Sequence, residues 1–217
     1  MPDYPLVFVH GWGFDSSFWD DLVQHFPEKA LHRIDLGFFG DADAGQDCPE
    51  GIYITHSLGT MWALHHAQDK IRGLVAINGF CTFRPFASKR VLEAMKTRLR
   101  QDLEVQMTEF MATCGLRKKH DIALFNVDRL EEGLDWLGTW DESKTLQGLD
   151  MPVLSLISAD DRILPLEGMR KMWQNSSVCV KGDGGHVLPQ SETAWCLSAI
   201  KDFLDDWKLE IKRSAEL

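Results

Sequence analysis

Three residues whose types could together perform nucleophilic catalysis occur in the chain in the order serine, aspartate, histidine. Ser57 stands in the run T-H-S-L-G, Asp161 follows an apolar run, and His186 follows two glycines. A serine hydroxyl is too weak an acid to attack an ester unaided, so a histidine must take its proton. A buried carboxylate would fix the imidazole tautomer and stabilise its charged form. The three residues therefore predict attack on an ester carbonyl by a serine.

The sequence around Ser57 predicts a sharp turn between a strand and a helix. Ile52 to Ile54 predict a short buried strand, and a helix begins near Leu58 and runs to about Gln68. A serine at such a corner is exposed, and the N–H of the next residue points into the same space. The usual pattern is G-x-S-x-G, and Thr55 replaces its first glycine here. Taken alone, the stretch is also consistent with a serine that only caps a helix.

A second turn with two glycines follows the first apolar run, at residues 10–13 (H-G-W-G). Glycines on both sides of one residue let the backbone fold tightly and direct an N–H outward. We therefore predict that the N–H of Trp12 lies beside that of Leu58 as a second donor to an oxyanion. The alternative is an ordinary turn between strand and helix, with His10 hydrogen-bonded inside it.

Short apolar runs alternate with helical and loop segments along much of the chain. The runs predict strands at residues 6–9, 30–36, 52–54, 71–77, 151–158 and 178–180. This alternation predicts an α/β fold with a mostly parallel sheet, which binds ligands at the carboxyl ends of its strands. His10, Ser57 and Asn78 each stand at the end of a predicted strand, so we expect them to converge on that edge.

Helices and a loop are expected between and after these strands. A helix is predicted from Asp15 to about Phe26, with Ser16 or Ser17 as its cap. The short polar stretch after Gly40 predicts a loop rather than a crossover helix. A last helix is predicted over residues 192–207, followed by a charged tail that frays.

The pattern changes to helical between Phe80 and Trp140. Apolar residues at steps of three and four predict one face of a long helix, and they are Leu92, Met95, Leu99, Leu103, Met107 and Phe110. A further helix is predicted over 127–137. We expect residues 80–140 to form a helical lid inserted into a core of residues 1–79 and 141–217. The candidates for substrate contact are Trp12, Phe80, Phe83, Met95 and Leu99, although core packing explains the apolar lid residues equally well.

Charge is distributed unevenly along the chain. The net charge of −10 argues against nucleic acid as a partner. Residues 84–119 nevertheless contain nine basic and four acidic side chains, so this segment is +5 and the remainder −15. Such asymmetry can steer an acidic partner to the lid. A solvated helix face with ordinary ion pairs is the alternative.

Length and composition place the chain among ordinary globular proteins. It has 217 residues and an apolar fraction of 44%, which suit one α/β domain. Its five cysteines are scattered without C-x-x-C spacing, which favours reduced thiols over disulfides or a zinc site. No apolar run approaches the ~20 residues of a membrane span, and no signal peptide is evident. We expect a monomeric cytoplasmic protein without a metal, an organic cofactor or a membrane partner.

Four short motifs resemble those of α/β-hydrolases. They are L-V-F-V-H-G-W-G at 6–13, T-H-S-L-G at 55–59, D-R-I-L-P at 161–165 and G-H at 185–186. The chain order serine, aspartate, histidine is the order that this fold uses. More narrowly, the chain resembles the pimeloyl-acyl-carrier-protein methyl ester esterases of biotin synthesis over nearly its whole length.

The resemblance implies hydrolysis of a methyl ester on a pimeloyl chain carried by acyl carrier protein, with release of methanol. It assigns Ser57 as the nucleophile, with Asp161 and His186 as its partners. It assigns the oxyanion hole to the N–H groups of Trp12 and Leu58. No cofactor is implied.

The resemblance also selects between two adjacent aspartates. Asp161 stands four residues before Pro165, the D-x-x-x-P spacing of α/β-hydrolases, and Asp160 does not. Asp183, which lies close to the histidine in sequence, is interpreted as a turn residue. His56 is expected to pack beside the serine or to shape its turn.

Three features depart from the family pattern. Thr55 replaces the elbow glycine, and the chain is shorter than the common esterase of this pathway. Val105 and Glu109 stand where the lid arginines that grip the carrier would be. The candidates for carrier binding in this segment are therefore Lys89, Arg90, Lys96, Arg98, Arg100, Arg117, Lys118 and Lys119.

Two other functions are consistent with the sequence. A general short-chain carboxylesterase or thioesterase would act on free small esters or another acyl thioester, without regard to the carrier. A non-catalytic binding protein of the same fold would be favoured by a strained turn at Thr55. Reaction of Ser57 with a fluorophosphonate probe separates the enzymes from the binding protein.

Overall fold

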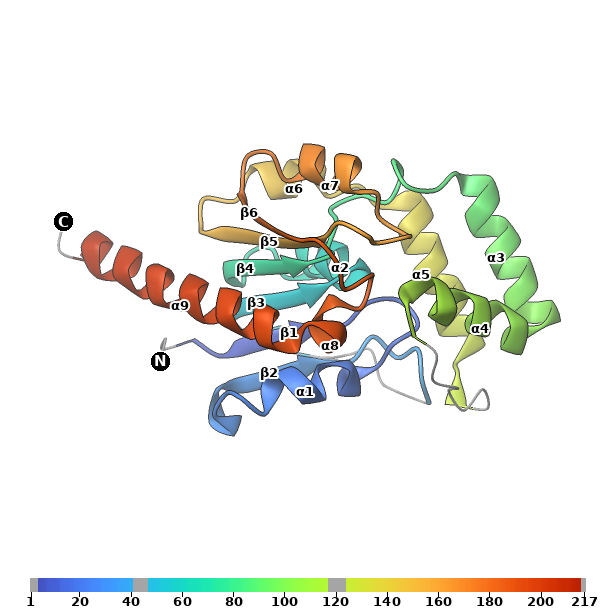
Figure 1. Cartoon of the computed structure of the whole chain (residues 1–217), viewed down its shortest axis with the longest axis horizontal. Helices are drawn as coiled ribbons and strands as arrows, with labels where there is room; N and C mark the ends of the chain where they lie inside the picture. The colour runs from blue at the N-terminus through green and yellow to red at the C-terminus, as the bar shows by residue number, and fades with distance from the viewer. Residues whose placement is uncertain (1–3, 41–46, 117–123, 216–217) are drawn as a thin grey trace.

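The sheet determines where the candidate residues lie. The structure is a computed structural model, and it describes residues 4–40, 47–116 and 124–215 (Figure 1). Six strands form one sheet in the order β2-β1-β3-β4-β5-β6, and every neighbouring pair is parallel. The strands are β1 (Leu6–Val9), β2 (Leu31–Ile34), β3 (Gly51–His56), β4 (Ile71–Ile77), β5 (Val153–Ser158) and β6 (Ser177–Lys181). The predicted α/β class with a parallel sheet is confirmed.

The central strands are apolar because both faces of the sheet are covered. Every residue of β1 and β3 is buried, whereas the edge strand β6 has none that is fully buried. Both faces of a parallel sheet must be covered by helices, so its central strands carry apolar side chains on both sides. This is why continuous apolar runs, rather than alternating ones, marked the strands in the sequence.

Helices cover the two faces of the sheet. Figure 1 shows α9 in front of the sheet and α2 behind it, and α1 and α8 pack with α9. The helices of these layers are α1 (Asp20–Val23), α2 (Leu58–His66), α6 (Ser143–Gln147), α7 (Leu166–Met172), α8 (Leu188–Ser191) and α9 (Thr193–Ala215). Among the described residues, no helix combines the length and apolar character needed to cross a membrane.

Two predictions about helix ends are wrong. The helix expected from Asp15 to Phe26 is a 3-10 turn at Ser16–Trp19 followed by the short α1, and the side chain of Asp15 caps the turn by accepting from the Ser17 N–H. The tail expected to fray after residue 207 continues as α9 to Ala215. Trp207 anchors this helix because its Nε1–H donates to the carbonyl of Arg72 at 2.7 Å.

A helical insertion lies beyond the carboxyl ends of the strands (Figure 1). We use this name for the described residues within 80–140, and its helices are α3 (Lys89–Gln101), α4 (Leu103–Cys114) and α5 (Val127–Thr139). The chain leaves and re-enters the core at one place, where an isolated bridge pairs Thr82 with Asp141. Its division from the rest of the chain as a lid domain remains a prediction.

The single long helix predicted through the insertion is wrong, because the chain breaks at Asp102. This residue has φ −155° and ψ 82°, and its carboxylate accepts from the Val105 N–H at 3.1 Å. Aspartate is a strong helix N-cap, so it ends α3 and begins α4. The apolar periodicity runs through the break because both helices bury a face against neighbouring elements.

Two hydrogen bonds of α5 tie the insertion to the strand ends. The Nε1–H of Trp12, after β1, donates to the carbonyl of Leu130 at 2.8 Å. The Nε–H of Arg129 donates to the carbonyl of Leu36, after β2, at 2.7 Å. The expected loop after Gly40 lies partly outside the described residues, and residues 47–50 hold neither helix nor strand.

Candidate active site

Ser57 occupies the corner between β3 and α2 in a backbone conformation that few L-residues adopt. Its φ is 53° and its ψ −125°, and its N–H donates to the carbonyl of Ile77 in β4 at 3.2 Å. A Cβ at Gly59 would lie 2.4 Å from the carbonyl oxygens of both Val9 and His10. The turn therefore needs glycine at position 59, and the neighbouring strands hold the serine in its strained conformation.

Thr55 is accommodated in place of the elbow glycine. It is fully buried, and its hydroxyl lies 2.7 Å from that of Thr60 and donates to the carbonyl of Val75 at 3.3 Å. Gly79 leaves the space that this pair requires, since a Cβ there would lie 2.0 Å from the Thr60 Oγ1. Because both hydroxyls find partners, the substitution buries no unsatisfied polar group.

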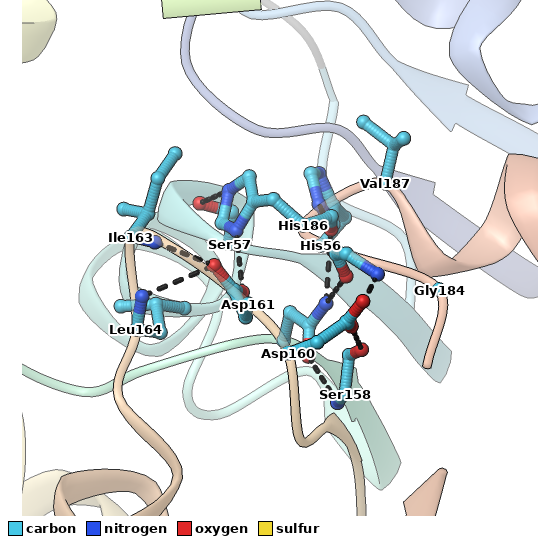
Figure 2. Close-up of polar contacts among 12 residues, drawn as sticks. His56, Ser57, Ser158, Asp160, Asp161, Ile163, Leu164, Gly184, His186 and Val187 are labelled. Carbon is cyan, nitrogen blue, oxygen red and sulfur yellow. Dashed lines mark hydrogen bonds and ion pairs between the residues drawn. The ribbon is translucent and has the colours of Figure 1, made fainter. Parts of the chain in front are cut away.

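The structure brings together Ser57, His186 and Asp161 (Figure 2). Nε2 of His186 lies 3.0 Å from the serine Oγ, and its Nδ1 lies 2.8 Å from Oδ2 of Asp161. The other carboxylate oxygen accepts the N–H groups of Ile163 at 2.7 Å and Leu164 at 3.1 Å. Because a carboxylate can only accept a hydrogen bond, we place the ring proton on Nδ1. The Nε2 lone pair then faces the serine hydroxyl.

The loop that carries His186 is held by two side chains that sequence reasoning left without a role. Nδ2 of Asn78 donates to the carbonyls of Gly185 and His186, both at 2.9 Å, and its Oδ1 accepts the Ser158 N–H at 2.9 Å. Oδ1 of Asp160 accepts the Gly185 N–H at 2.8 Å and the Ser158 hydroxyl at 2.6 Å (Figure 2). Asp160 therefore positions the loop, whereas Asp161 contacts the imidazole.

His56 also supports the loop that carries His186. It is fully buried, its ring stacks on Phe18 with centroids 4.4 Å apart, and its Nε2–H donates to the carbonyl of His186 at 3.0 Å. Burial, reinforced by the nearby His186, lowers the pKa of His56 well below its usual range. His56 is thus a neutral packing residue of the corner.

The two predicted oxyanion donors lie beside the nucleophile. Leu58 begins α2, where the first N–H groups of a helix lack intrahelical partners. Gly11 brings the Trp12 turn against the serine, since a Cβ on Gly11 would lie 2.9 Å from the Ser57 Cβ. In the part of the chain that the structure describes, neither the Trp12 nor the Leu58 backbone N–H donates to another group. Their role as an oxyanion hole remains a prediction.

His10 forms part of the Trp12 turn. Its Nδ1–H donates to the carbonyl of Gly11 at 2.9 Å, and its Nε2 accepts the Leu36 N–H at 2.9 Å. The Nε2 contact therefore connects the ends of β1 and β2, whereas the Nδ1 contact lies within the turn after β1. His10 accordingly has the hydrogen-bonded position that the alternative interpretation of the H-G-W-G run expected.

A cavity of about 310 Å³ opens onto Ser57 and His186. Of the predicted substrate contacts, Trp12, Phe80, Phe83 and Met95 line it. Leu99 does not line it, and its side chain packs in the core. The lining residues that sequence reasoning did not propose are Phe86, Ala87, Val91, Leu92, Gln106, Glu109, Phe110, Thr113, Leu137, Arg162 and Ile163.

Three of the predicted carrier-binding residues are engaged within the helical insertion. Lys96 pairs with Asp135, and Arg98 pairs with Glu109 at 2.8 Å. Arg100 pairs with both Asp128 and Glu131 of α5 at 2.5 Å. The count over residues 84–119 left out the acids of α5, which neutralise much of the positive charge of α3.

The other predicted carrier-binding residues differ in their surroundings. Lys89 and Arg90 are exposed at the start of α3, and within the described residues neither forms an ion pair. Arg117, Lys118 and Lys119 lie outside the described residues.

Neither a disulfide nor a metal cluster is found in the described parts of the chain. All five cysteines are free thiols, and burial raises the pKa of Cys196 to about 12. No group of three or more histidine, cysteine, aspartate or glutamate side chains among the described residues could hold a metal ion.

Comparison with known proteins gives matches over most of the chain. The family model described as "Alpha/beta hydrolase family" matches residues 6–199. A pimeloyl-[acyl-carrier protein] methyl ester esterase from Legionella pneumophila is 26% identical, over 79% of this chain and 81% of its own. An esterase from Exiguobacterium antarcticum has a TM-score of 0.78 at 16% identity, covering 93% of this chain and 92% of its own. A bromoperoxidase from Bacillus anthracis has a TM-score of 0.77 at 16% identity, with the same coverage.

Proposed function

Because this chain belongs to the alpha/beta hydrolase family, we propose that it is a serine carboxylesterase that hydrolyses the methyl ester of pimeloyl-acyl carrier protein. The observation that carries the proposal is the continuous hydrogen-bonded line from Ser57 through His186 to Asp161, which opens into a cavity with a largely apolar wall. The relative from Legionella pneumophila supports the choice of substrate.

The reaction begins at the serine hydroxyl. Nε2 of His186 accepts the hydroxyl proton while Oγ of Ser57 attacks the ester carbonyl carbon, and Asp161 stabilises the imidazolium that forms. The tetrahedral oxyanion accepts hydrogen bonds from the N–H groups of Trp12 and Leu58. Loss of one such donor typically costs about 10²–10³ in rate.

The intermediate then collapses in two stages. The imidazolium of His186 gives its proton to the departing methoxide oxygen, so methanol leaves and the acyl group stays on Ser57. A water molecule then gives a proton to His186 and attacks the acyl carbonyl. Return of that proton to the serine oxygen releases the free carboxylic acid and regenerates the enzyme.

The surroundings of the serine suit an acyl chain more clearly than they suit a carrier protein. Aromatic and aliphatic side chains such as Phe80, Phe83 and Met95 line the cavity, and burial of methylene groups against them is favourable. By contrast, Arg98 and Arg100 are already paired with acids of the helical insertion. This second observation favours a general short-chain carboxylesterase or thioesterase as the alternative function.

The decisive experiment compares methanol release from methyl-pimeloyl carrier protein with hydrolysis of free short-chain esters. Fast turnover of the carrier-bound ester that Ser57→Ala abolishes would support both the nucleophile and the substrate. Slow turnover on the carrier beside fast hydrolysis of free esters would overturn the carrier assignment and favour the general esterase. Activity of Ser57→Ala equal to wild type would overturn the serine mechanism.

A further inference from the structure

The substrate cavity has two walls of different chemistry. One wall comes from the segment after β4 and from α3, and its lining residues are all apolar: Phe80, Phe83, Phe86, Ala87, Val91, Leu92 and Met95. The other wall is one face of α4, with residues at positions i, i+3, i+4 and i+7, and these are Gln106, Glu109, Phe110 and Thr113. Three of the four residues on the α4 wall are polar. An acyl chain needs only the first wall.

Gln106 is the residue of the α4 wall whose side chain has a buried polar atom without a hydrogen-bond partner among the described residues. Thr113 donates its hydroxyl hydrogen to the carbonyl of Glu109 at 2.8 Å, and the Glu109 carboxylate pairs with Arg98 at 2.8 Å. Gln106 is only 4% exposed, and among the described residues its Oε1 has no hydrogen-bond partner. A buried amide oxygen without a partner is unfavourable, so a polar residue at this position indicates a ligand that supplies one.

The chemistry of the side chain restricts what that ligand is. A carboxamide offers an acceptor oxygen and two N–H donors in one plane, and its terminal torsion is soft enough to turn either atom toward the cavity. A secondary amide offers one donor and one acceptor in the same way.

We propose that Gln106 is a specificity-determining residue that binds a secondary amide in the acyl part of the substrate. The inference rests on the proposed esterase function, because it places this amide in the cavity that also holds the scissile ester. The apolar wall then takes the methylene chain, and the α4 wall takes the amide. The carrier protein is not needed for the contact.

Two methyl esters of equal chain length test the contact in turnover. One has a secondary amide within its acyl chain, and the other has two methylenes in place of the amide. In Gln106→Leu we expect the ratio of kcat/KM for the amide ester to that for the alkyl ester to fall about 10-fold, the effect of one to two neutral hydrogen bonds. Turnover of the alkyl ester stays the same or rises.

A matched control and a second variant distinguish an amide contact from a structural role of Gln106. Gln101→Leu makes the same change at an exposed position at the end of α3 and should leave the ratio unchanged. Gln106→Met keeps an unbranched side chain of similar length and should lower the ratio as Gln106→Leu does. Equal loss for both esters, or an unchanged ratio in both Gln106 variants, would overturn the inference in favour of a purely structural role.

Binding to the Ser57→Ala background separates this inference from the proposed function. Calorimetry should give about 10-fold weaker binding of the amide ester to Ser57→Ala/Gln106→Leu than to Ser57→Ala, and equal binding of the alkyl ester. Equal binding of the amide ester to both would overturn the amide contact while leaving ester hydrolysis intact. Weaker binding without turnover by the wild type would support the contact and overturn the esterase.

Discussion

The strand-end corner around Ser57 and the helical insertion above it use polar side chains in opposite ways. In the corner, Asn78 and Asp161 each make several hydrogen bonds, and almost all of their partners are backbone groups. In the insertion, Arg98 and Arg100 pair with other charged side chains at exposed positions. The corner therefore depends on a few buried contacts, and the insertion on several weak exposed ones. Substitutions should have graded effects that follow this difference.

The largest expected effect is on catalysis, from Asp161→Asn. An amide can still accept the Ile163 and Leu164 N–H groups, but it no longer stabilises the imidazolium or enforces the correct tautomer of His186. We expect kcat to fall about 10⁴-fold, with the fold retained. The measurement is steady-state kinetics on a short-chain ester, with circular dichroism as the check on folding.

The adjacent aspartate provides the matched control for Asp161→Asn. Asp160→Asn keeps an oxygen that can accept from Gly185 and Ser158. It should reduce kcat far less, because Asp160 acts on the loop rather than on the imidazole. Equal losses in the two variants would contradict the assignment of the carboxylate.

The next effect is on stability, from Asn78→Ala. The change removes three hydrogen bonds and leaves the carbonyls of Gly185 and His186 with one partner fewer. It also places alanine at a positive φ of 43°. We expect the free energy of unfolding to fall by about 3 kcal/mol, as measured by urea denaturation.

The helical insertion offers a comparable asparagine. Asn126 caps α5 by accepting the Arg129 N–H at 3.1 Å, at a partly exposed position. Asn126→Ala should cost about 1 kcal/mol, the usual value for a lost N-cap. A greater loss in Asn126→Ala than in Asn78→Ala would break the contrast between the two regions.

His56 should make the corner sensitive to pH. Burial lowers its pKa in the folded state, so below the unfolded pKa of about 6.5 the unfolded chain takes up a proton that the folded chain does not. The contribution of His56 to stability is therefore full above that pH and is lost as the pH falls. We expect up to about 1.4 kcal/mol of lost stability per pH unit from this residue.

The variant His56→Gln isolates this effect from the other histidines. Glutamine does not titrate, and its amide retains a donor for the carbonyl of His186. The difference in unfolding free energy between wild type and variant, measured from pH 7.5 to 5.5, should shrink as the pH falls. A constant difference would contradict the neutral state of His56.

The smallest effect is expected in the helical insertion, from Arg100→Ala. The arginine is exposed and water screens its pairs with Asp128 and Glu131, so such pairs contribute little to stability. We expect a smaller shift of the urea midpoint than for any substitution above.

Arg100→Ala should also reduce turnover of methyl-pimeloyl carrier protein less than Lys89→Ala does, because Lys89 is exposed and unpaired among the described residues.

The strands of the sheet, and the residues that follow them, were predictable because strands depend on local patterns of apolar residues. Ser57 and Asn78 directly follow buried strands, and the ends of parallel strands meet at one edge whatever the loops do. The α/β class with a parallel sheet was predictable from the same strand ends, whereas the α/β-hydrolase assignment rested on the resemblance of four short motifs. The position of Asp161 also followed from a short local motif.

Features that depend on the packing of helices could not be predicted in this way. Met95 and Leu99 share one face of α3, yet Met95 lines the cavity and Leu99 packs in the core. The partners of Arg100 lie about thirty positions away in α5. No pattern in the sequence marked Gln106, which is buried because α4 packs against the cavity.

The bridge between Thr82 and Asp141 has a consequence for the evolution of this architecture. The backbone N–H of Glu142 also donates to the carbonyl of Cys81 at 2.8 Å. Backbone contacts therefore hold the two ends of the intervening segment side by side. We therefore expect that changes in sequence between these two ends leave the order and register of the strands unchanged. Changes in the helical insertion would then alter which substrates bind, while the residues at the strand ends stay the same.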